Sequence, residues 1–284
     1  MIRNEILSNH EHFGFIKISG KNTKKFLDGQ FSCNVLNLKK NTVLKASYVN
    51  AKGKIISSFM LFYNKENEYY IYINKDIINS TIKDLKKYSV FSNLKIEDYT
   101  NKFSCIILKK IFFKNIINAK TTMYKCNVGV FILGRKHVLH KLEKYLRKYF
   151  FLIKQSLREF NFRNFLYGSI NLSLDNYYKY LPYDLNKMKY VDKKKGCFKG
   201  QEIIIRIKYK SILKKRISIF KINSRRLFNQ MNSKIFFNNI YIGNITDYVF
   251  YNNICYISSY IKLNYYDNKK FFLNGYLINH IKYL

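Results

Sequence analysis

Apolar and polar residues alternate along the first hundred positions in a pattern that predicts an antiparallel sheet. Residues 13–19 (FGFIKIS) form one such stretch. Residues 43–49 (VLKASYV) and 55–63 (IISSFMLFY) are joined by the turn NAKGK, and residues 69–73 (YYIYI) follow the turn KENE. Short alternating runs bounded by turn residues are typical of strands joined as hairpins. We therefore expect four strands here.

Two stretches in the same region have helical spacing instead. A short helix is predicted after Asn22 or Thr23, which would cap it, and it ends at Gly29. Residues 76–88 form the second. The residues expected on the buried sides of these two helices are Phe26, Leu27, Ile78, Ile82 and Leu85.

The pattern from residue 91 to residue 148 predicts more strands and then a second amphipathic helix. Strands are expected at 91–97, 103–111, 122–127 and 128–134, and the helix at 136–148. The apolar side of that helix is expected to carry Val138, Leu142, Tyr145 and Tyr149.

The last part of the chain divides into an irregular stretch and a series of short strands. Ser156 is expected to open a helix, an irregular segment follows it, and Gln201 begins another short helix. From about Ser211 onward, short strands with Asn-rich turns predict a small barrel or sandwich. The predicted fold class is therefore α+β, with an α+β body at 1–210 and an all-β domain at 211–284.

Composition leaves two readings of the charge open. The chain has 284 residues, a formal net charge of +35 and 18% aromatic residues, which is typical of a folded globular protein. A strong positive charge favours a nucleic-acid partner. Lys, Asn, Ile, Tyr and Phe are also encoded by A/T-rich codons, so the lysines could equally be solvated faces. Aromatic residues and lysines interleave throughout and mark no single RNA surface.

The cysteines and the apolar runs point to a reducing cytoplasm. The five cysteines are an odd number without a CxxC pair, which argues against a disulfide framework and a structural zinc site. No run reaches the length of a membrane helix, and the first residues lack the apolar core of a signal peptide. We expect no metal site from the five histidines, and no nucleotide-binding or serine-hydrolase motif occurs.

The stretch KKKGCFKGQE at 193–202 holds the strongest candidate for chemistry. Cys197 lies between two glycines in a chain with only 11 of them, and it follows a run of lysines. A thiol beside lysines ionises more easily than an isolated one. A helix that starts at Gln201 would also present backbone N–H groups to an anion. The alternative is a glycine-rich turn with an inert cysteine.

Three separated stretches together resemble one family, the YgfZ group of folate-binding, tRNA-modifying proteins, which is related to the glycine-cleavage T protein. ISGKNTKKFLDGQ resembles its N-terminal strand and helix, and NAKGKIISSFMLF followed by DLKKYSVFS resembles its middle region. The stretch KGCFKGQE resembles its signature, K-G-C-[YF]-x-G-Q-E. The residues that match the signature are Lys195, Gly196, Cys197, Phe198, Gly200, Gln201 and Glu202.

The resemblance implies two interleaved α+β lobes around a folate cleft, plus a C-terminal barrel like that of the T protein. It implies an accessory role in tRNA modification, supporting iron–sulfur enzymes that carry out methylthiolation, and a link to iron–sulfur cluster assembly or repair. Cys197 would be the reactive thiol, with Lys195 lowering its pKa. Phe13 and Phe160 stand where the family contacts tetrahydrofolate with two tryptophans, which this chain lacks.

Two other function classes stay open from the sequence. The first is a folate-dependent one-carbon transferase like the T protein, which needs a carboxylate beside the reactive folate nitrogen. Leu166 and Asn50 stand at the family's acidic positions and supply none. The second is a basic module that binds tRNA directly, whose affinity should fall steeply with salt. The accessory role without turnover is the preferred interpretation.

Overall fold

The computed structural model describes residues 5–8, 13–108, 121–126, 129–150, 153–154, 182, 190–192, 194–210, 215–222, 234–251, 253–262, 271–273 and 276–283. Contacts divide the chain into two units, which are described separately. The first holds the described residues among Met1–Asn50, Ile56–Ser156 and Tyr190–Lys199. The second holds those among Ala51–Ile55, Leu157–Lys189 and Gly200–Leu284. The boundary at residue 210 stays a prediction.

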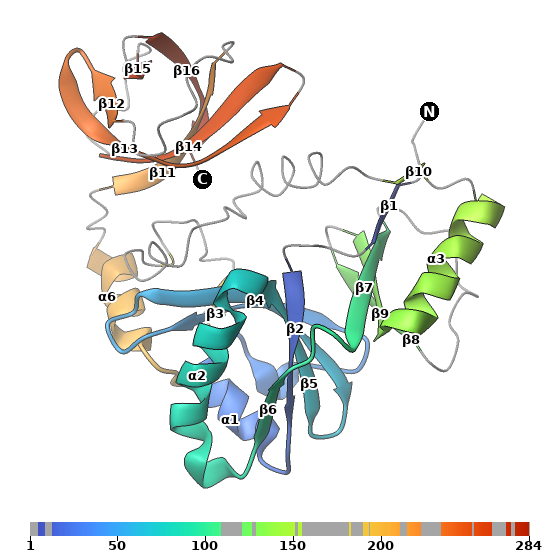
Figure 1. Ribbon diagram of the computed structural model, residues 1–284. Coiled ribbons are helices and arrows are strands. Elements are labelled where there is room, and N and C mark those ends of the chain that lie inside the picture. Colours follow the sequence, from blue (N-terminus) through green and yellow to red (C-terminus); the bar gives the residue numbers. More distant parts are fainter. Residues whose placement is uncertain are drawn as a thin grey trace. The chain divides into compact units, whose positions relative to one another are not determined.

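The first unit contains a five-stranded sheet in the order β3-β4-β5-β2-β6 (Figure 1). Its strands are β2 (Phe13–Ser19), β3 (Val43–Val49), β4 (Ile55–Lys65), β5 (Glu68–Asn74) and β6 (Lys95–Asp98). β2 pairs antiparallel with β5 on one side and with β6 on the other. The four strands predicted before residue 74 are confirmed, and short turns join β3 to β4 and β4 to β5 as expected.

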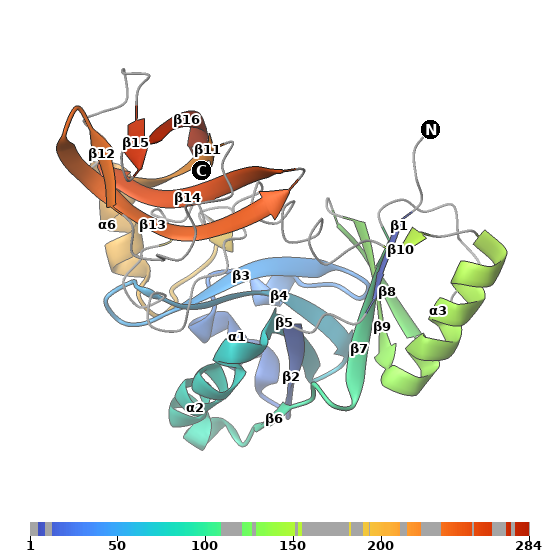
Figure 2. The ribbon, with the colours of Figure 1, turned by 45° about the horizontal axis from the view of Figure 1, so that its top comes forward.

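Helices α1 (Thr23–Gln30) and α2 (Ile78–Ser89) lie side by side next to this sheet (Figures 1 and 2). Phe26 and Leu27 are buried as predicted, and so are Ile78 and Leu85. Ile82 is only partly buried. Short 3-10 helices flank the α-helices: η1 (Val35–Asn37), η2 (Lys75–Ile77) and η3 (Val90–Ser92).

The strand predicted at 91–97 is shorter than expected. Residues Val90–Ser92 continue the end of α2 as a 3-10 helix, and Asn93 adopts a left-handed conformation with φ 49°. A left-handed residue turns the chain, so β6 begins only at Lys95.

A second five-stranded sheet in the first unit has the order β10-β1-β7-β9-β8. Its strands are β1 (Glu5–Ser8), β7 (Phe103–Leu108), β8 (Thr121–Cys126), β9 (Gly129–Arg135) and β10 (Ile153–Lys154). The chain thus contributes β1 to this sheet, forms the other sheet, and then returns. The two α+β lobes are therefore interleaved, as predicted.

Helix α3 (Lys136–Phe150) packs on the second sheet with a face that only partly matches the predicted one. Leu139 and Leu146 are buried against strand residues such as Ile106, and Leu142 packs at the edge of the same cluster. Tyr145 is 50% exposed. The prediction was right for Leu142 and wrong for Tyr145, because the buried stripe follows the leucines one turn apart.

The second unit contains a closed barrel of strands in the order β11-β14-β13-β12-β15-β16, which confirms the predicted all-β module. The barrel strands are β11 (Lys215–Ile222), β12 (Lys234–Phe237), β13 (Ile240–Tyr251), β14 (Ile254–Lys262), β15 (Phe271–Leu273) and β16 (Tyr276–Tyr283). Their inward residues form one apolar cluster around Phe220 and Phe271. The same unit holds helix α6 (Gln201–Lys210), which was predicted from Gln201. The predicted helix after Ser156 lies outside the described residues.

Candidate functional site

Backbone hydrogen bonds attach the stretch Tyr190–Lys199, here called the motif segment, to the end of helix α1. The amide of Asp192 donates to the carbonyl oxygen of Ser32 at 2.8 Å, and the hydroxyl of Ser32 donates to the carbonyl oxygen of Tyr190 at 2.7 Å. Further along, the amide of Lys199 donates to the carbonyl oxygen of Gly29 at 3.1 Å. These bonds join residues far apart in the chain and fix both ends of the segment.

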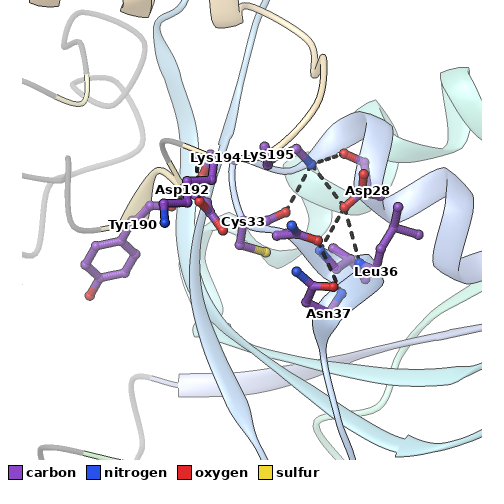
Figure 3. A network of polar contacts seen from close by, with 11 residues as sticks. Asp28, Cys33, Leu36, Asn37, Tyr190, Asp192, Lys194 and Lys195 are labelled. Carbon is purple, nitrogen blue, oxygen red and sulfur yellow. Dashed lines mark hydrogen bonds and ion pairs between the residues drawn. The ribbon is translucent and has the colours of Figure 1, made fainter.

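Lys195 anchors the middle of the motif segment from inside the protein (Figure 3). Its side chain is fully buried, and its ammonium lies 3.2 Å from a carboxylate oxygen of Asp28. The ammonium also donates to the carbonyl oxygen of Cys33 at 3.0 Å and to that of Asp28. A buried lysine needs such partners, because an unpaired ammonium in the interior is very costly.

Asp28 is the acidic centre of this network. Its carboxylate also accepts a hydrogen bond from the amide of Val35 at 2.8 Å, and so caps the short helix η1. The carboxylate is therefore shared between Lys195 and the backbone of a neighbouring turn. A substitution of Lys195 is therefore expected to affect the turn at Val35 as well, because both bind the same carboxylate of Asp28.

The thiol of Cys33 lies in the same buried region and is poorly suited to react. Only 3% of the residue is exposed. Burial raises the pKa of Cys33 to about 12, although the nearby charge of Lys195 acts in the opposite direction. The desolvation of a thiolate outweighs the attraction to one ammonium. Cys33 is thus a structural cysteine.

Cys197 has the opposite environment, because it is exposed while residues on both sides of it are buried. Lys195 and Phe198 are 6% and 7% exposed, and the ammonium of Lys195 lies 5.4 Å from the centre of the Phe198 ring. Two buried anchors so close together in the chain force the residues between them outward. The motif segment therefore presents Gly196 and the Cys197 thiol to solvent.

Lys199 is a further anchor on the opposite side of the thiol. Its ammonium lies 3.4 Å from a carboxylate oxygen of Asp84 and donates to the hydroxyl of Tyr48 at 3.2 Å. It also lies over the ring of Tyr88 at 4.0 Å from its centre. Lys199 therefore ties the segment to strand β3 and helix α2 together.

The pKa of Asp84 reflects this cluster. Burial by itself would raise the pKa of Asp84, but the hydrogen bond from Tyr48, the charge of Lys199 and the hydrogen bond from Lys87 outweigh it. The net effect is a pKa below the usual value, so the carboxylate stays charged.

The two glycines of the motif have different environments. Gly200 has φ 76°, in the left-handed region where other residues are strained, and it precedes helix α6. A Cβ on Gly196 would meet no atom within 4 Å. The positive φ favours glycine at position 200, whereas a side chain at position 196 would meet no steric obstacle. In the second unit, Gly53 also has a positive φ, and a Cβ there would lie 3.1 Å from Ile203 of helix α6.

The remaining residues of the signature lie at the start of helix α6. Gln201 is the first residue of the helix and Glu202 lies in its first turn. The Glu202 side chain is 80% exposed and forms an ion pair with Arg206 at 2.8 Å. An exposed pair of this kind contributes little to stability.

Phe13, the first predicted folate contact, lines a groove in the first unit. Its ring stacks on that of Tyr72 with centres 4.9 Å apart. A small cavity of about 30 Å³ here adjoins a larger one of about 370 Å³, and both are lined by Ser104, Cys105 and Lys136. The larger cavity continues along the first turns of α3, where its lining includes His137, His140 and Glu143. Phe160, the second predicted contact, lies outside the described residues.

The described residues that line these two cavities do not include Cys197. The predicted effect of Lys195 on the thiol of Cys197 stays a prediction, and the partners of that lysine are Asp28 and Cys33. Within the described part of the chain, no three His, Cys, Asp or Glu side chains gather as a metal site. No helix there is long and apolar enough to cross a membrane.

Sequence reasoning missed the acidic partners of the two anchoring lysines. Asp28 lies in the stretch ISGKNTKKFLDGQ and Asp84 in DLKKYSVFS, two of the stretches that carry the family resemblance. Acidic residues are scarce, 17 against 52 basic ones, so each buried lysine needs one of few possible partners. That scarcity was the signal that could have identified them.

Comparisons with known proteins show which sequences this chain is similar to. No family model matches the chain. The chain is 28% identical over 251 residues to the tRNA-modifying protein YgfZ of Buchnera aphidicola subsp. Baizongia pistaciae, covering 75% of this chain and 76% of the relative. It is 29% identical to the YgfZ protein of Buchnera aphidicola subsp. Schizaphis graminum, covering 78% and 75%.

The fold has a clear counterpart among solved structures. The glycine cleavage system aminomethyltransferase T from Bartonella henselae superposes with a TM-score of 0.78 at 12% identity, covering 98% of this chain and 85% of that one. The likeness confirms the predicted α+β architecture with a C-terminal barrel. The resemblance predicted from three short stretches is also confirmed: the chain is similar in sequence to YgfZ tRNA-modifying proteins and shares the fold of the aminomethyltransferase.

Proposed function

We propose that this protein is a folate-binding accessory protein in tRNA modification, with Cys197 as its reactive thiol. It would act in the cytoplasm without turnover of its own. It would support iron–sulfur enzymes that methylthiolate tRNA, or the assembly or repair of their clusters. The names of its relatives support the tRNA role, and the aminomethyltransferase fold supports folate as the ligand.

The observation that carries this proposal is the contrast between Cys197 and its two buried neighbours. Lys195 and Phe198 are sequestered in the interior while the thiol between them is exposed. Burying a lysine and its carboxylate partner costs desolvation free energy, and a simple turn needs no buried ion pair. Exposed thiols are the ones that undergo redox chemistry or bind a cluster transiently.

The groove at Phe13 is the proposed folate site. The half-buried ring of Phe13 packs on the buried ring of Tyr72 and lines the small cavity together with Lys75 and Lys136. A folate has an aromatic pterin and a glutamate tail with carboxylates. Aromatic stacking on one side and ammonium groups on the other match those two chemical parts.

A one-carbon transferase is the second candidate, because the fold is that of an aminomethyltransferase. Such a reaction requires a carboxylate beside the folate nitrogen that carries the carbon. Asn50, at the turn before Gly53, carries an amide instead. We therefore place the accessory role first, and turnover of an aminomethyl donor in the presence of tetrahydrofolate would reverse that order.

Calorimetry with tetrahydrofolate tests the ligand part of the proposal. We expect wild-type protein to bind, and Phe13→Ala to bind about two- to tenfold more weakly, since an aromatic pair contributes roughly 0.5–1.5 kcal/mol. Phe91→Ala is the matched control, because it removes the same ring from a position that is 99% exposed and does not line the groove. Absence of binding, or equal weakening in both variants, would reject the proposed site.

A further inference from the structure

The end of helix α2 exposes three apolar side chains close together, here called the apolar tip. Phe91 is 99% exposed, Val90 is 70% exposed and Tyr88 is 46% exposed. A phenylalanine ring that is wholly in solvent gains nothing from burial and so contributes nothing to folding. Contiguous exposed apolar residues of this kind mark interaction sites. The apolar tip lies between α2 and β6 (Figure 1).

The backbone holds the apolar tip in place. The 3-10 helix Val90–Ser92 carries two of its residues, and Asn93 ends it in a left-handed conformation. Gly20 packs so closely here that a Cβ on it would lie 2.8 Å from the carbonyl oxygen of Asn93. The next residues, from Lys95, pair with β2. The exposed side chains are therefore presented by a turn that is fixed on both sides.

Exposed lysines flank the apolar tip along the chain. The exposed ones in this stretch are Lys83, Lys86, Lys87 and Lys95. Asp84 and Glu97, two carboxylates of the same stretch, are already paired, Asp84 with Lys87 and Lys199 and Glu97 with Lys95. Among the described residues, Lys83 and Lys86 make no ion pair. The apolar tip thus combines exposed aromatic rings with exposed, positively charged lysines nearby in the chain.

We infer that the apolar tip and its lysines form a binding site for single-stranded RNA. Bases would stack on the Phe91 ring, and phosphates would contact the ammonium groups of Lys83 and Lys86. Stacking on aromatic side chains beside a positive surface is the general way in which proteins bind unpaired strands. The inference deepens the proposed role in tRNA modification, on which it rests, and needs neither the folate site nor the thiol.

The lysines by themselves have two ordinary causes, and neither accounts for the aromatic ring. Lys86 and Lys87 lie in the last turn of α2, where positive charge favours the helix dipole, and lysine is abundant in the whole chain. The composition that enriches lysine also enriches phenylalanine, but it does not explain why the ring of Phe91 is 99% exposed when most phenylalanines in the described residues are buried. An acidic protein would complement the charge as well, and failure of an RNA oligomer to bind would favour it over RNA.

Fluorescence titration of a short, labelled uridine oligomer, at several salt concentrations, tests the inference. Phe91→Ala should weaken binding on the order of tenfold, because one base loses its stacking partner. It should leave binding of an RNA duplex of the same length unchanged, since paired bases cannot stack on the ring. The double variant Lys83→Ala, Lys86→Ala should lower the slope of log affinity against log salt by about 1.4, as expected for two lost phosphate contacts.

Matched controls are available on helix α3. Tyr145→Ala removes a half-exposed aromatic ring, and Lys141→Ala with Lys144→Ala removes two lysines from the surface of that helix. These variants should bind the oligomer like the wild-type protein. The inference is overturned if the α2 and α3 variants weaken binding equally or if the oligomer does not bind.

The RNA site and the folate site can be tested independently. Phe91→Ala should bind tetrahydrofolate like wild type in the calorimetry described above. Loss of oligomer binding with intact folate binding supports the inference. Intact oligomer binding in a protein that binds no folate would reject the folate site and leave the RNA site standing.

Discussion

Cys33 and Cys197 both lie next to Lys195, one through space and the other along the chain, yet their environments are opposite. Cys33 is buried and its pKa is raised to about 12, whereas Cys197 is exposed. The difference does not come from the charge of the lysine. It comes from the backbone around each thiol: Cys33 lies in the buried core, whereas Cys197 lies between two buried anchors, Lys195 and Phe198, and faces solvent.

The two cysteines show what the lysine of this motif does in the fold. A lysine next to a cysteine in sequence suggests a direct effect on the thiol. In the structure its ammonium is taken up by Asp28 and by carbonyl oxygens. Its visible contribution is positional, because it fixes the segment that presents Cys197.

The largest expected effect is in thiol reactivity. With a pKa of about 12, Cys33 has on the order of a thousandfold less thiolate at pH 8 than a free thiol of ordinary pKa about 8.5. We expect iodoacetamide at pH 8 to modify Cys197 in native protein and to leave Cys33 unmodified over the same period. Mass spectrometry of the peptides measures both. Comparable labelling of the two cysteines would contradict the expected difference in their reactivity.

The next effect is on stability, at the buried anchor. Lys195→Met should lower the free energy of unfolding by about 3 kcal/mol, because it leaves the mostly buried carboxylate of Asp28 without its cation. Urea denaturation measures the change. Lys194→Met is the matched control on the adjacent exposed lysine and should stay within about 0.5 kcal/mol of wild type. Equal losses of unfolding free energy in both variants would mean that the buried position of Lys195 does not contribute to stability.

A smaller effect is expected at Lys199. Lys199→Ala should cost about 1–2 kcal/mol, since it removes a partly buried ion pair and a cation–π contact with Tyr88. The lowered pKa of Asp84 makes this cost depend on pH. The carboxylate contributes fully above its usual pKa of 3.8 and loses its contribution as pH falls through its lower folded value.

Denaturation of wild type and Lys199→Ala from neutral to acidic pH checks this anchor. The gap between the two proteins should narrow as pH falls below the usual pKa of Asp84 and the carboxylate becomes protonated. Lys86→Ala, which removes an exposed lysine on the same helix, should show a small gap without this pH dependence. A constant gap for Lys199→Ala would contradict the assigned pairing.

Much of the fold could be predicted from the sequence, and the reasons are local. β2 and β3 begin and end where the alternating pattern does, because turn residues bound them. The pattern failed at residues 91–94, where a left-handed Asn93 and a 3-10 helix are set by packing against Gly20. It also failed on α3, where tyrosines and leucines compete for the buried face and only the tertiary contacts decide.

The site was predicted unevenly. The motif and the family resemblance singled out Cys197, which is exposed, while its chemistry stays a prediction. The pattern could not reveal that Lys195 turns inward to Asp28, which lies 167 positions away in the chain. It also could not identify Phe91, whose exposure depends on where η3 ends. Contacts over long sequence separations leave no trace in periodicity.

The central claim is that the exposed thiol of Cys197 carries the function. The most direct measurement is the level of methylthiolated tRNA in a strain that lacks its YgfZ protein and carries variants of this chain. We predict that Cys197→Ser fails to restore the modification although the protein folds, whereas Cys33→Ser restores it to the extent that the protein remains folded. Restoration by Cys197→Ser to the wild-type level would contradict the account.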